Sequence, residues 1–310
     1  MSPGRDSVAQ TQVASMETNR YPYLPIIERK QLKWPNGARL AFWVCLNIEY
    51  FHIDKPLRGV SASPLPDVQG YSLRDYGLRV GVFRIMKSLD RYVLRASVFL
   101  NADVCKRCPT IIEEGNKRQW EWLGHGITNN LHMSDYPPEE ERNIIRQVKA
   151  TITAAAGTTP QGWAGPGLAE TMNTPDHVAA EGFEYLCDWG CDDQPIPMRV
   201  RSGRMIVVPV HPSISDISIF LRSNHTPQEY LMQVCDHFDS LYKEGAQSGR
   251  VMALPLHPFV IGLPFRIKYL DRALEYICSH DGVWLTTGGE IARWYYQHYY
   301  EDPGIAEKAS

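Results

Sequence analysis

The segment LAFWVCLNIE, residues 40–49, decides the fold because it joins an apolar strand to a polar end. Side chains alternate along a strand, so Leu46 and Ile48 face one side while Asn47 and Glu49 face the other. A carboxylate at such a place can act as a general base or as a metal ligand. The alternative is a solvated acid that merely ends the strand.

Three more reactive side chains follow strand-like segments in the same way. His125, Asp188 and His257 each come directly after a short apolar segment. In a barrel of parallel strands the carboxyl ends converge on one face, where such enzymes keep their catalytic groups. We therefore expect an enzyme in which these side chains and Glu49 share one pocket.

Strand-like and helix-like segments alternate from Asn36 onward, which predicts an α/β fold with a parallel sheet and crossover helices. Eight strands, enough for a barrel, are expected at residues 40–48, 95–100, 120–124, 161–164, 183–187, 205–210, 251–256 and 282–285. Helices are expected at residues 75–92, 138–156, 175–180, 227–244, 265–279 and 289–298. Residues 51–72, rich in Pro and Gly, are expected to form a loop over the top face.

The length of 310 residues, with 44% hydrophobic side chains, suits one large core. We expect a single domain over residues 21–300. Residues 1–20 are expected to form a flexible N-terminal extension, and residues 301–310 a flexible tail.

Charge and composition narrow the class of partner. The formal net charge is -3 and the Lys and Arg residues are scattered, which argues against a nucleic-acid partner. No apolar segment reaches the roughly 18 residues of a membrane helix, and the N-terminus lacks the apolar region of a signal peptide. Seven dispersed cysteines indicate reduced thiols. We expect a cytoplasmic protein with a small-molecule substrate and no membrane partner.

The histidines suggest metal binding or proton transfer. His125 lies between two glycines, and Asn129 occupies the i+4 position where a helical turn would place a second metal ligand. An amide is a poorer ligand than an imidazole, and for His132 a structural role is the alternative. His257 has a side chain with an ordinary pKa of about 6.5, which suits protonation of a leaving nitrogen. The alternative for His257 is a structural role, in which its side chain is hydrogen-bonded to the backbone at the strand end.

The segment from Asp188 to Asp193 places three acids and an indole within six residues. Acids this close repel one another unless a cation, an arginine or a hydrogen-bonding substrate separates them. We assign Asp188, Trp189 and Asp192 to substrate binding. An exposed acidic loop is the alternative for Asp192 and Asp193.

Taken in order, these motifs resemble the polysaccharide deacetylase superfamily, and within it the branch of allantoinase-like and cyclic-imide-hydrolase-like proteins. The likeness covers about residues 34–296. Its motifs are Asn-x-Glu at 47–49, YGLRVGVFR at 76–84, Gly-His-Gly at 124–126, Gly-Trp at 162–163, the acids at 188 and 192–193, Leu-His at 256–257 and Ile-Gly-x-Pro at 261–264.

The resemblance implies an α/β fold, a distorted (β/α) barrel with seven or eight parallel strands, that hydrolyses a C–N bond of an amide or imide. Glu49 stands at the place of the family's acidic motif, His125 at its first histidine and His257 at its late histidine. Asn129 replaces the second histidine, and residues 165–167 (Gly-Pro-Gly) stand where an arginine motif would be. These departures make the usual metal route of sugar deacetylation doubtful.

We accordingly expect a hydrolase of a small amide or a cyclic imide or ureide, with Glu49, His257 and His125 as catalytic residues. Trp163 and Arg79 are expected to join the substrate-binding residues. The alternatives are a metal-dependent deacetylase of an N-acetylated sugar or metabolite, and a non-catalytic small-molecule-binding relative.

The resemblance implies either no tightly bound cofactor or a weakly bound divalent metal such as zinc. Its ligands would be Glu49, His125 and Asn129, with His132 as the rival third ligand. Related proteins form dimers or tetramers, and the aromatic residues 294–300 favour a homo-oligomer because tyrosines are enriched at interfaces. Packing of the last helix onto the barrel is the alternative.

Overall fold

The computed structural model describes residues 20–56 and 65–300. The expected tail at 301–310, and the extension at 1–20 except for its last residue, lie outside the described residues. That last residue, Arg20, belongs to the domain, because its guanidinium forms an ion pair of 2.7 Å with the Asp176 carboxylate.

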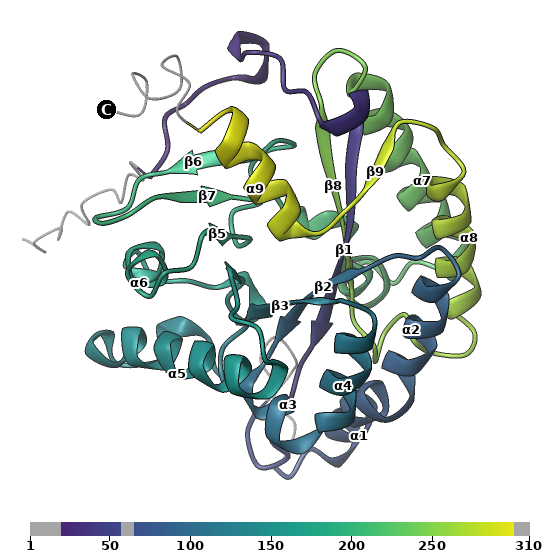
Figure 1. Ribbon diagram of the computed structural model, residues 1–310. Helices are drawn as coiled ribbons and strands as arrows, with labels where there is room; N and C mark the ends of the chain where they lie inside the picture. Colours follow the sequence, from purple (N-terminus) through teal and green to yellow (C-terminus); the bar gives the residue numbers. More distant parts are fainter. Residues whose placement is uncertain (1–19, 57–64, 301–310) are drawn as a thin grey trace, which may run out of the picture.

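Nine strands form one curled sheet with helices around its outside (Figure 1). Along the sheet the order is β6-β7-β5-β4-β3-β2-β1-β8, and β9 pairs with β1. All pairs are parallel except β6 with β7. The strands are β1 Leu40–Ile48, β2 Ala96–Leu100, β3 Glu121–Gly124, β4 Gly162–Trp163, β5 Tyr185–Leu186, β6 Ile196–Met198, β7 Met205–Val207, β8 Arg250–Leu256 and β9 Val283–Leu285. The expected distorted α/β barrel is confirmed.

Strand β1 is the centre of the sheet because it pairs with three other strands. Its first seven residues pair with β8, its first three also pair with β9, and its last five pair with β2. All nine of its residues are buried. Glu49, the next residue, is thereby fixed at the carboxyl edge of the sheet.

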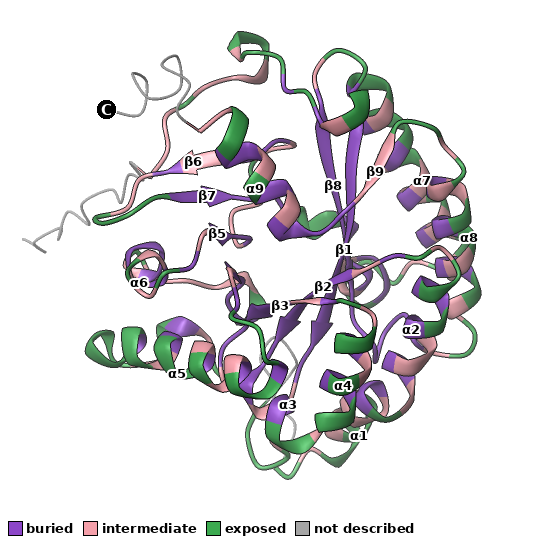
Figure 2. Cartoon of the chain, viewed as in Figure 1, coloured by how far each residue is buried: buried purple, intermediate pink, exposed green. Residues whose placement is uncertain are grey.

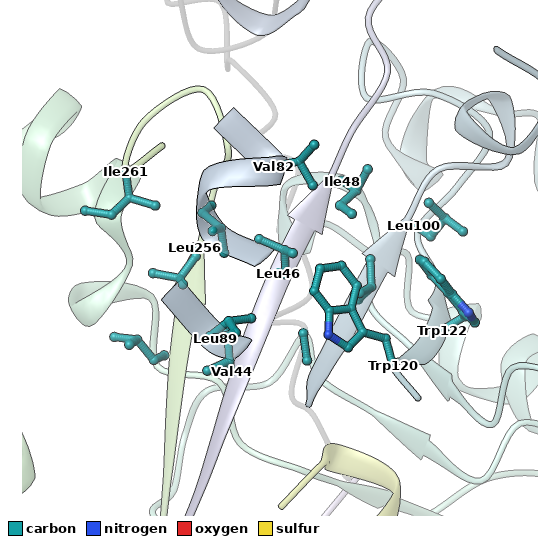
Figure 3. Close-up of a cluster of buried hydrophobic side chains, with 14 of the residues drawn as sticks. Val44, Leu46, Ile48, Val82, Leu89, Leu100, Trp120, Trp122, Leu256 and Ile261 are labelled. Carbon is teal, nitrogen blue, oxygen red and sulfur yellow. The ribbon is translucent and has the colours of Figure 1, made fainter. Parts of the chain in front are cut away.

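The two faces of β1 bury two different groups of side chains. Val44, Leu46 and Ile48 point outward and pack against helix α2 (Val82–Asp90), including Val82 and Leu89 (Figure 3). The opposite face carries Ala41, Trp43 and Cys45 into the barrel interior, where further side chains from β2, β3 and β5 join them. The alternation expected from the sequence is therefore present, and Asn47 and Glu49 continue the interior face.

The helices show buried inner sides and exposed outer sides (Figure 2); most lie around the outside of the sheet, whereas the last one packs against the interior cluster that contains Trp43. They are α1 Val68–Tyr76, α2 Val82–Asp90, α3 Ala102–Arg107, α4 Pro109–Lys117, α5 Pro138–Ala156, α6 Thr174–Ala180, α7 Pro227–Glu244, α8 Ile267–Cys278 and α9 Gly288–His298. Helix α7 begins with the capping box of Thr226 and Glu229. None of the described helices is both long and apolar enough to cross a bilayer.

Several elements differ from the sequence-based expectation. Helix α1 occupies part of the expected loop, because Asp67 caps it by accepting from the Gly70 N–H at 2.9 Å. Helices α3 and α4 and strand β6 were not expected. Strand β6 contains Pro197, which lacks an N–H and so suits an edge strand, where β6 lies.

The open side of the curled sheet is bridged at the amino end of β8. The Val251 N–H donates to the Asp193 carbonyl oxygen at 2.8 Å. Beside it, the buried Gln194 donates through Nε2 to the Gly249 carbonyl oxygen at 2.8 Å and to Ser248 Oγ at 2.9 Å. These bonds tie the segment before β6 to β8 without a continuous strand pair.

Candidate active site

Three of the expected reactive side chains meet at the carboxyl ends of β1, β3 and β8. Glu49 Oε1 lies 3.5 Å from His125 Nε2 and 3.9 Å from His257 Nε2. All three residues are buried. Both distances are longer than a normal hydrogen bond, so each Nε2 atom keeps its capacity to bind water or substrate.

Asp216 holds His257 in place. Its Oδ1 accepts from His257 Nδ1 at 2.6 Å, and its Oδ2 accepts from the His257 backbone N–H at 2.8 Å. Asp216 is fully buried between the short helical turns 212–214 and 218–222. Because the carboxylate engages Nδ1, the opposite nitrogen, Nε2, is directed toward Glu49.

His125 is oriented by the backbone. Its Nδ1 donates to the Ala164 carbonyl oxygen at 2.6 Å, and a carbonyl can only accept, so Nδ1 carries the proton. In the neutral ring Nε2 is therefore an acceptor facing the Glu49 carboxylate. This Nε2 is buried without a hydrogen-bond partner among the described residues.

The same peptide group links His125 to Asp188. While the Ala164 carbonyl accepts from His125, the Gly165 N–H donates to Asp188 at 2.8 and 3.0 Å. Burial, and the neighbouring Glu170 carboxyl, raise the pKa of Asp188 well above its ordinary value. Asp188 thus supports the peptide that orients His125.

Two buried asparagines tie the strand ends together. Asn101 follows β2, accepts from the Tyr50 N–H at 2.9 Å and donates to the His125 carbonyl oxygen. Asn47 Nδ2 donates to the Leu256 carbonyl oxygen at 3.2 Å. The ends of β1, β2, β3 and β8 are consequently held in one arrangement around Glu49.

The pKa values of Glu49 and His257 move in opposite directions. Burial acts to raise the pKa of Glu49, but the close contact with His125 and the charges of His257 and Arg74 outweigh it and lower that pKa. Burial acts to lower the pKa of His257, but Asp216 and Glu49 outweigh it and raise that pKa. The site therefore favours a carboxylate facing an imidazolium.

The YGLRVG motif positions the segment that carries His257. A Cβ atom on Gly77 would lie 2.7 Å from the Phe259 backbone nitrogen, and one on Gly81 would lie 2.1 Å from the Pro258 carbonyl oxygen. Only glycine allows this approach of helix to loop. The motif therefore acts by packing and does not itself contribute a reacting group.

A narrow cavity of about 10 Å³ opens beside Glu49. Its lining includes Tyr50, Phe51, Tyr71 and Arg74. It provides the approach to the buried carboxylate from the surface.

The other expected substrate-binding residues lie elsewhere. Trp163 is fully buried and packs against Phe183 in the outer core. Arg79 is exposed and pairs with Asp75 at 2.5 Å, and Asp192 pairs with Arg29, also at 2.5 Å. The structure does not bring these residues to Glu49.

Trp189 has its indole N–H bonded to Glu170 at 2.8 Å and its ring edge-on to Tyr21, with centroids 5.8 Å apart. The structure places its side chain beside Glu170 and Tyr21.

The donors near Glu49 do not complete a metal site. Among residues 20–56 and 65–300, no three His, Cys, Asp or Glu side chains form a group that could hold a metal ion, so His132 does not join Glu49 and His125. Asn129 lies on a turn and not on a helix, and its Oδ1 is buried without a partner in the described chain. One carboxylate, one imidazole and one amide oxygen fall short of the ligand set that zinc prefers.

Sequence reasoning missed Asp216, Arg74 and Asn101. Asp216 did carry a signal, because it stands among Ile214, Ile217 and other apolar residues, and a buried acid needs a partner. Arg74 and Asn101 carried none, since their roles depend on which loops the fold brings together.

The curled parallel sheet, with an acid and two imidazoles at its carboxyl edge, defines an α/β-barrel enzyme. Residues 71–186 match the polysaccharide deacetylase family model. A Schizosaccharomyces pombe protein named as a polysaccharide deacetylase is 22% identical over 307 residues, covering 86% of this chain and 94% of that protein.

Solved structures are similar over nearly the whole chain. The Puue allantoinase is 28% identical with a TM-score of 0.78, covering 88% of this chain and 95% of its own. A Pseudomonas aeruginosa PAO1 protein, also named as a polysaccharide deacetylase, is 26% identical with a TM-score of 0.79, covering 88% and 96%. The chain thus resembles polysaccharide deacetylases, and the expected class, a hydrolase of C–N bonds other than peptide bonds, is confirmed.

Proposed function

We propose that this chain hydrolyses the C–N bond of a small amide, or of a cyclic imide or ureide, by acid–base catalysis. The observation that carries the proposal is the pair formed by Glu49 and His257, which face each other at 3.9 Å with pKa values displaced in opposite directions. Such a pair supplies a base and an acid at the same pH. The likeness to an allantoinase supports a small nitrogenous substrate.

In the proposed reaction Glu49 takes a proton from water, and the water oxygen attacks the carbonyl carbon. His125 Nε2, an acceptor beside Glu49, orients that water. When the tetrahedral intermediate collapses, the C–N bond breaks and His257 Nε2–H protonates the leaving nitrogen. The proton on Glu49 then passes through solvent to His257, which restores both the carboxylate and the imidazolium.

Replacement of the proposed base tests this assignment. We expect Glu49→Gln, and separately His257→Ala, to lower kcat by about a hundredfold or more while the circular dichroism spectrum stays that of the wild type. Turnover would be measured on hydantoin, succinimide and allantoin. A variant of either residue that retains the wild-type rate would rule out its assigned role.

The second candidate is metal-dependent deacetylation of an N-acetylated compound. It is favoured by two buried atoms that lack partners in the described chain, His125 Nε2 and Asn129 Oδ1. Titration of the protein with Zn²⁺ by calorimetry, with His125→Ala as control, decides between the candidates. Tight binding of one ion that His125→Ala abolishes, together with activity lost on chelation, would favour this second function.

A further inference from the structure

Arg74 of α1 is a half-buried cation with few hydrogen-bond partners among the described residues. Its guanidinium donates through Nη1 to the Gly70 carbonyl oxygen at 3.0 Å, and its Nε is buried with no partner among the described residues. Glu49 and Asp67 act on it through their charges, without a hydrogen bond. An arginine side chain offers five N–H donors, so most of its capacity is unused.

Two phenyl rings hold this cation beside the catalytic carboxylate. The guanidinium carbon lies 4.8 Å from the centroid of Phe51 and 5.1 Å from that of Phe259. Phe51 follows Glu49 by two residues, and Phe259 follows His257 by two, so the rings belong to the loops that present the proposed base and acid. Cation–π contact keeps the guanidinium in place without neutralising its charge.

Removing a guanidinium from water is costly unless a partner of opposite charge compensates. Burial indeed lowers the pKa of Arg74. Glu49 and Asp67 supply opposite charge, but neither gives the buried Nε a hydrogen bond, so a ligand carboxylate beside Nε would add the partner that the described residues do not supply.

The cavity that Arg74 shares with Glu49 fits a small group. The space in it that a water-sized group can occupy is about 10 Å³, so it admits only the end of a substrate. A carboxylate matches the planar donor set of a guanidinium.

We propose that Arg74 binds a carboxylate of the substrate, so that the preferred substrates are anionic amides or ureides with a carboxylate near the C–N bond that is cleaved. The proposal rests on the proposed hydrolase function. It makes Arg74 a specificity-determining residue of that site, a role that the sequence reading gave to Arg79.

The test compares two substrates that differ only in charge, hydantoin-5-acetate and hydantoin-5-acetamide. We expect the wild type to favour the acetate in kcat/KM, and Arg74→Gln to reduce this preference about 10- to 100-fold, the value of a charge-assisted hydrogen bond. Any effect of Arg74 on the pKa of Glu49 changes both rates alike and cancels in the ratio. Arg74→Lys, which keeps the charge, should retain most of the preference.

Arg91→Gln is the matched control, because Arg91 is 60% exposed at the end of α2 and pairs with Asp271. It should leave the ratio unchanged. An unchanged ratio in Arg74→Gln would overturn the inference while leaving the proposed hydrolysis intact.

A binding measurement separates the two proposals if neither hydantoin is cleaved. Succinate titrated by calorimetry should bind the wild type and Arg91→Gln at least 10-fold more tightly than Arg74→Gln. That result would support the carboxylate site even if the proposed hydrolysis failed. Equal binding to all three proteins, or no binding to the wild type, would overturn it.

Discussion

At the scale of single residues, Asp216 determines how well His257 can donate a proton. Its carboxylate is buried and bonded to both nitrogen atoms of His257 that face it, the backbone N–H and Nδ1. Because the charge of Asp216 favours the imidazolium, His257 stays protonated to a higher pH than an ordinary histidine would. This extends the pH range over which the proposed acid is active.

Asp216→Asn should therefore move the alkaline limb of the kcat/KM profile to lower pH. The amide oxygen can still accept from Nδ1, but the stabilising charge is lost, so His257 gives up its proton earlier. The acid limb, which reports protonation of Glu49 below the usual carboxyl range, should move much less. The measurement is kcat/KM against pH for both proteins.

Asp236→Asn, an exposed position on α7, serves as the control and should leave both limbs in place. If Asp216→Asn keeps the wild-type alkaline limb, His257 is not the group that limits the rate at high pH.

The sequence alone placed Glu49, His125 and His257 at strand ends, because period-two alternation and barrel geometry act locally. It could not show which groups Asp216 and Arg74 would contact. Asp216 is 41 residues from His257 in the chain, and their contact depends on how the 211–222 segment folds over β8. The assignment of Arg79 to substrate binding was wrong for a similar reason. Arg74 and Arg79 are five residues apart on one helical segment, and the rotation of that segment about its axis decides which of them faces the cavity.

At the scale of elements, the close contact of the 77–81 turn with the loop after β8 supports the site. This π-helical turn joins α1 to α2, so one continuous helical segment carries both Arg74 and the two glycines that touch Pro258 and Phe259. A shift of this segment would move the cation and the proposed acid together.

Gly81→Ala should therefore lower both stability and activity. The added Cβ would lie 2.1 Å from the Pro258 carbonyl oxygen, so backbone must move, at a cost of about 1–3 kcal/mol in the free energy of unfolding. Because Pro258 follows His257, kcat/KM should fall as well. Urea unfolding and steady-state kinetics on the same preparations measure the two effects.

Gly157→Ala is the comparison variant. Gly157 ends α5 with φ +74°, and no other atom lies within 4 Å of its added Cβ. It should cost about 1 kcal/mol through backbone strain and leave kcat/KM unchanged. Equal kinetic losses in both variants would show that the Gly81 contact has no special relation to the site.

The long elements were predictable, and the short ones were not. Strand β1 and helices α5 and α7 have long periodic patterns with clear ends, as at Thr226. Helix α3 has six residues and β6 has three, so neither repeats its pattern often enough to be recognised, and tertiary contacts decide their conformation. The prediction of a loop over residues 51–72 was wrong from Val68 onward, where α1 begins. The Asp67 side chain caps this helix and starts it despite the prolines that precede it.

At the scale of the whole molecule, a few hydrogen bonds join the segment before β6 to the start of β8 and so bridge the open side of the barrel. Gln194 is buried there and donates twice toward the start of β8. These contacts lie at the amino end of β8, whereas His257 follows its carboxyl end, so stability and activity depend on opposite ends of the same strand.

Gln194→Ala should lower the free energy of unfolding by about 1–3 kcal/mol, because it leaves the Gly249 carbonyl oxygen without its buried donor. We expect kcat/KM at ambient temperature to stay at the wild-type value. Gln247→Ala, at an exposed position near the same strand, should change neither quantity. A loss of activity in Gln194→Ala without a loss of stability would contradict this separation.

The ionised state of Glu49 also bears on how a turnover ends. Hydrolysis of an amide creates a new carboxylate, and in the proposed reaction it is formed against the one already present. Two like charges at contact distance repel each other, most strongly where water is scarce. The enclosure that activates Glu49 would thus also expel the acid product, which predicts weak product inhibition and a reverse reaction disfavoured by the site itself.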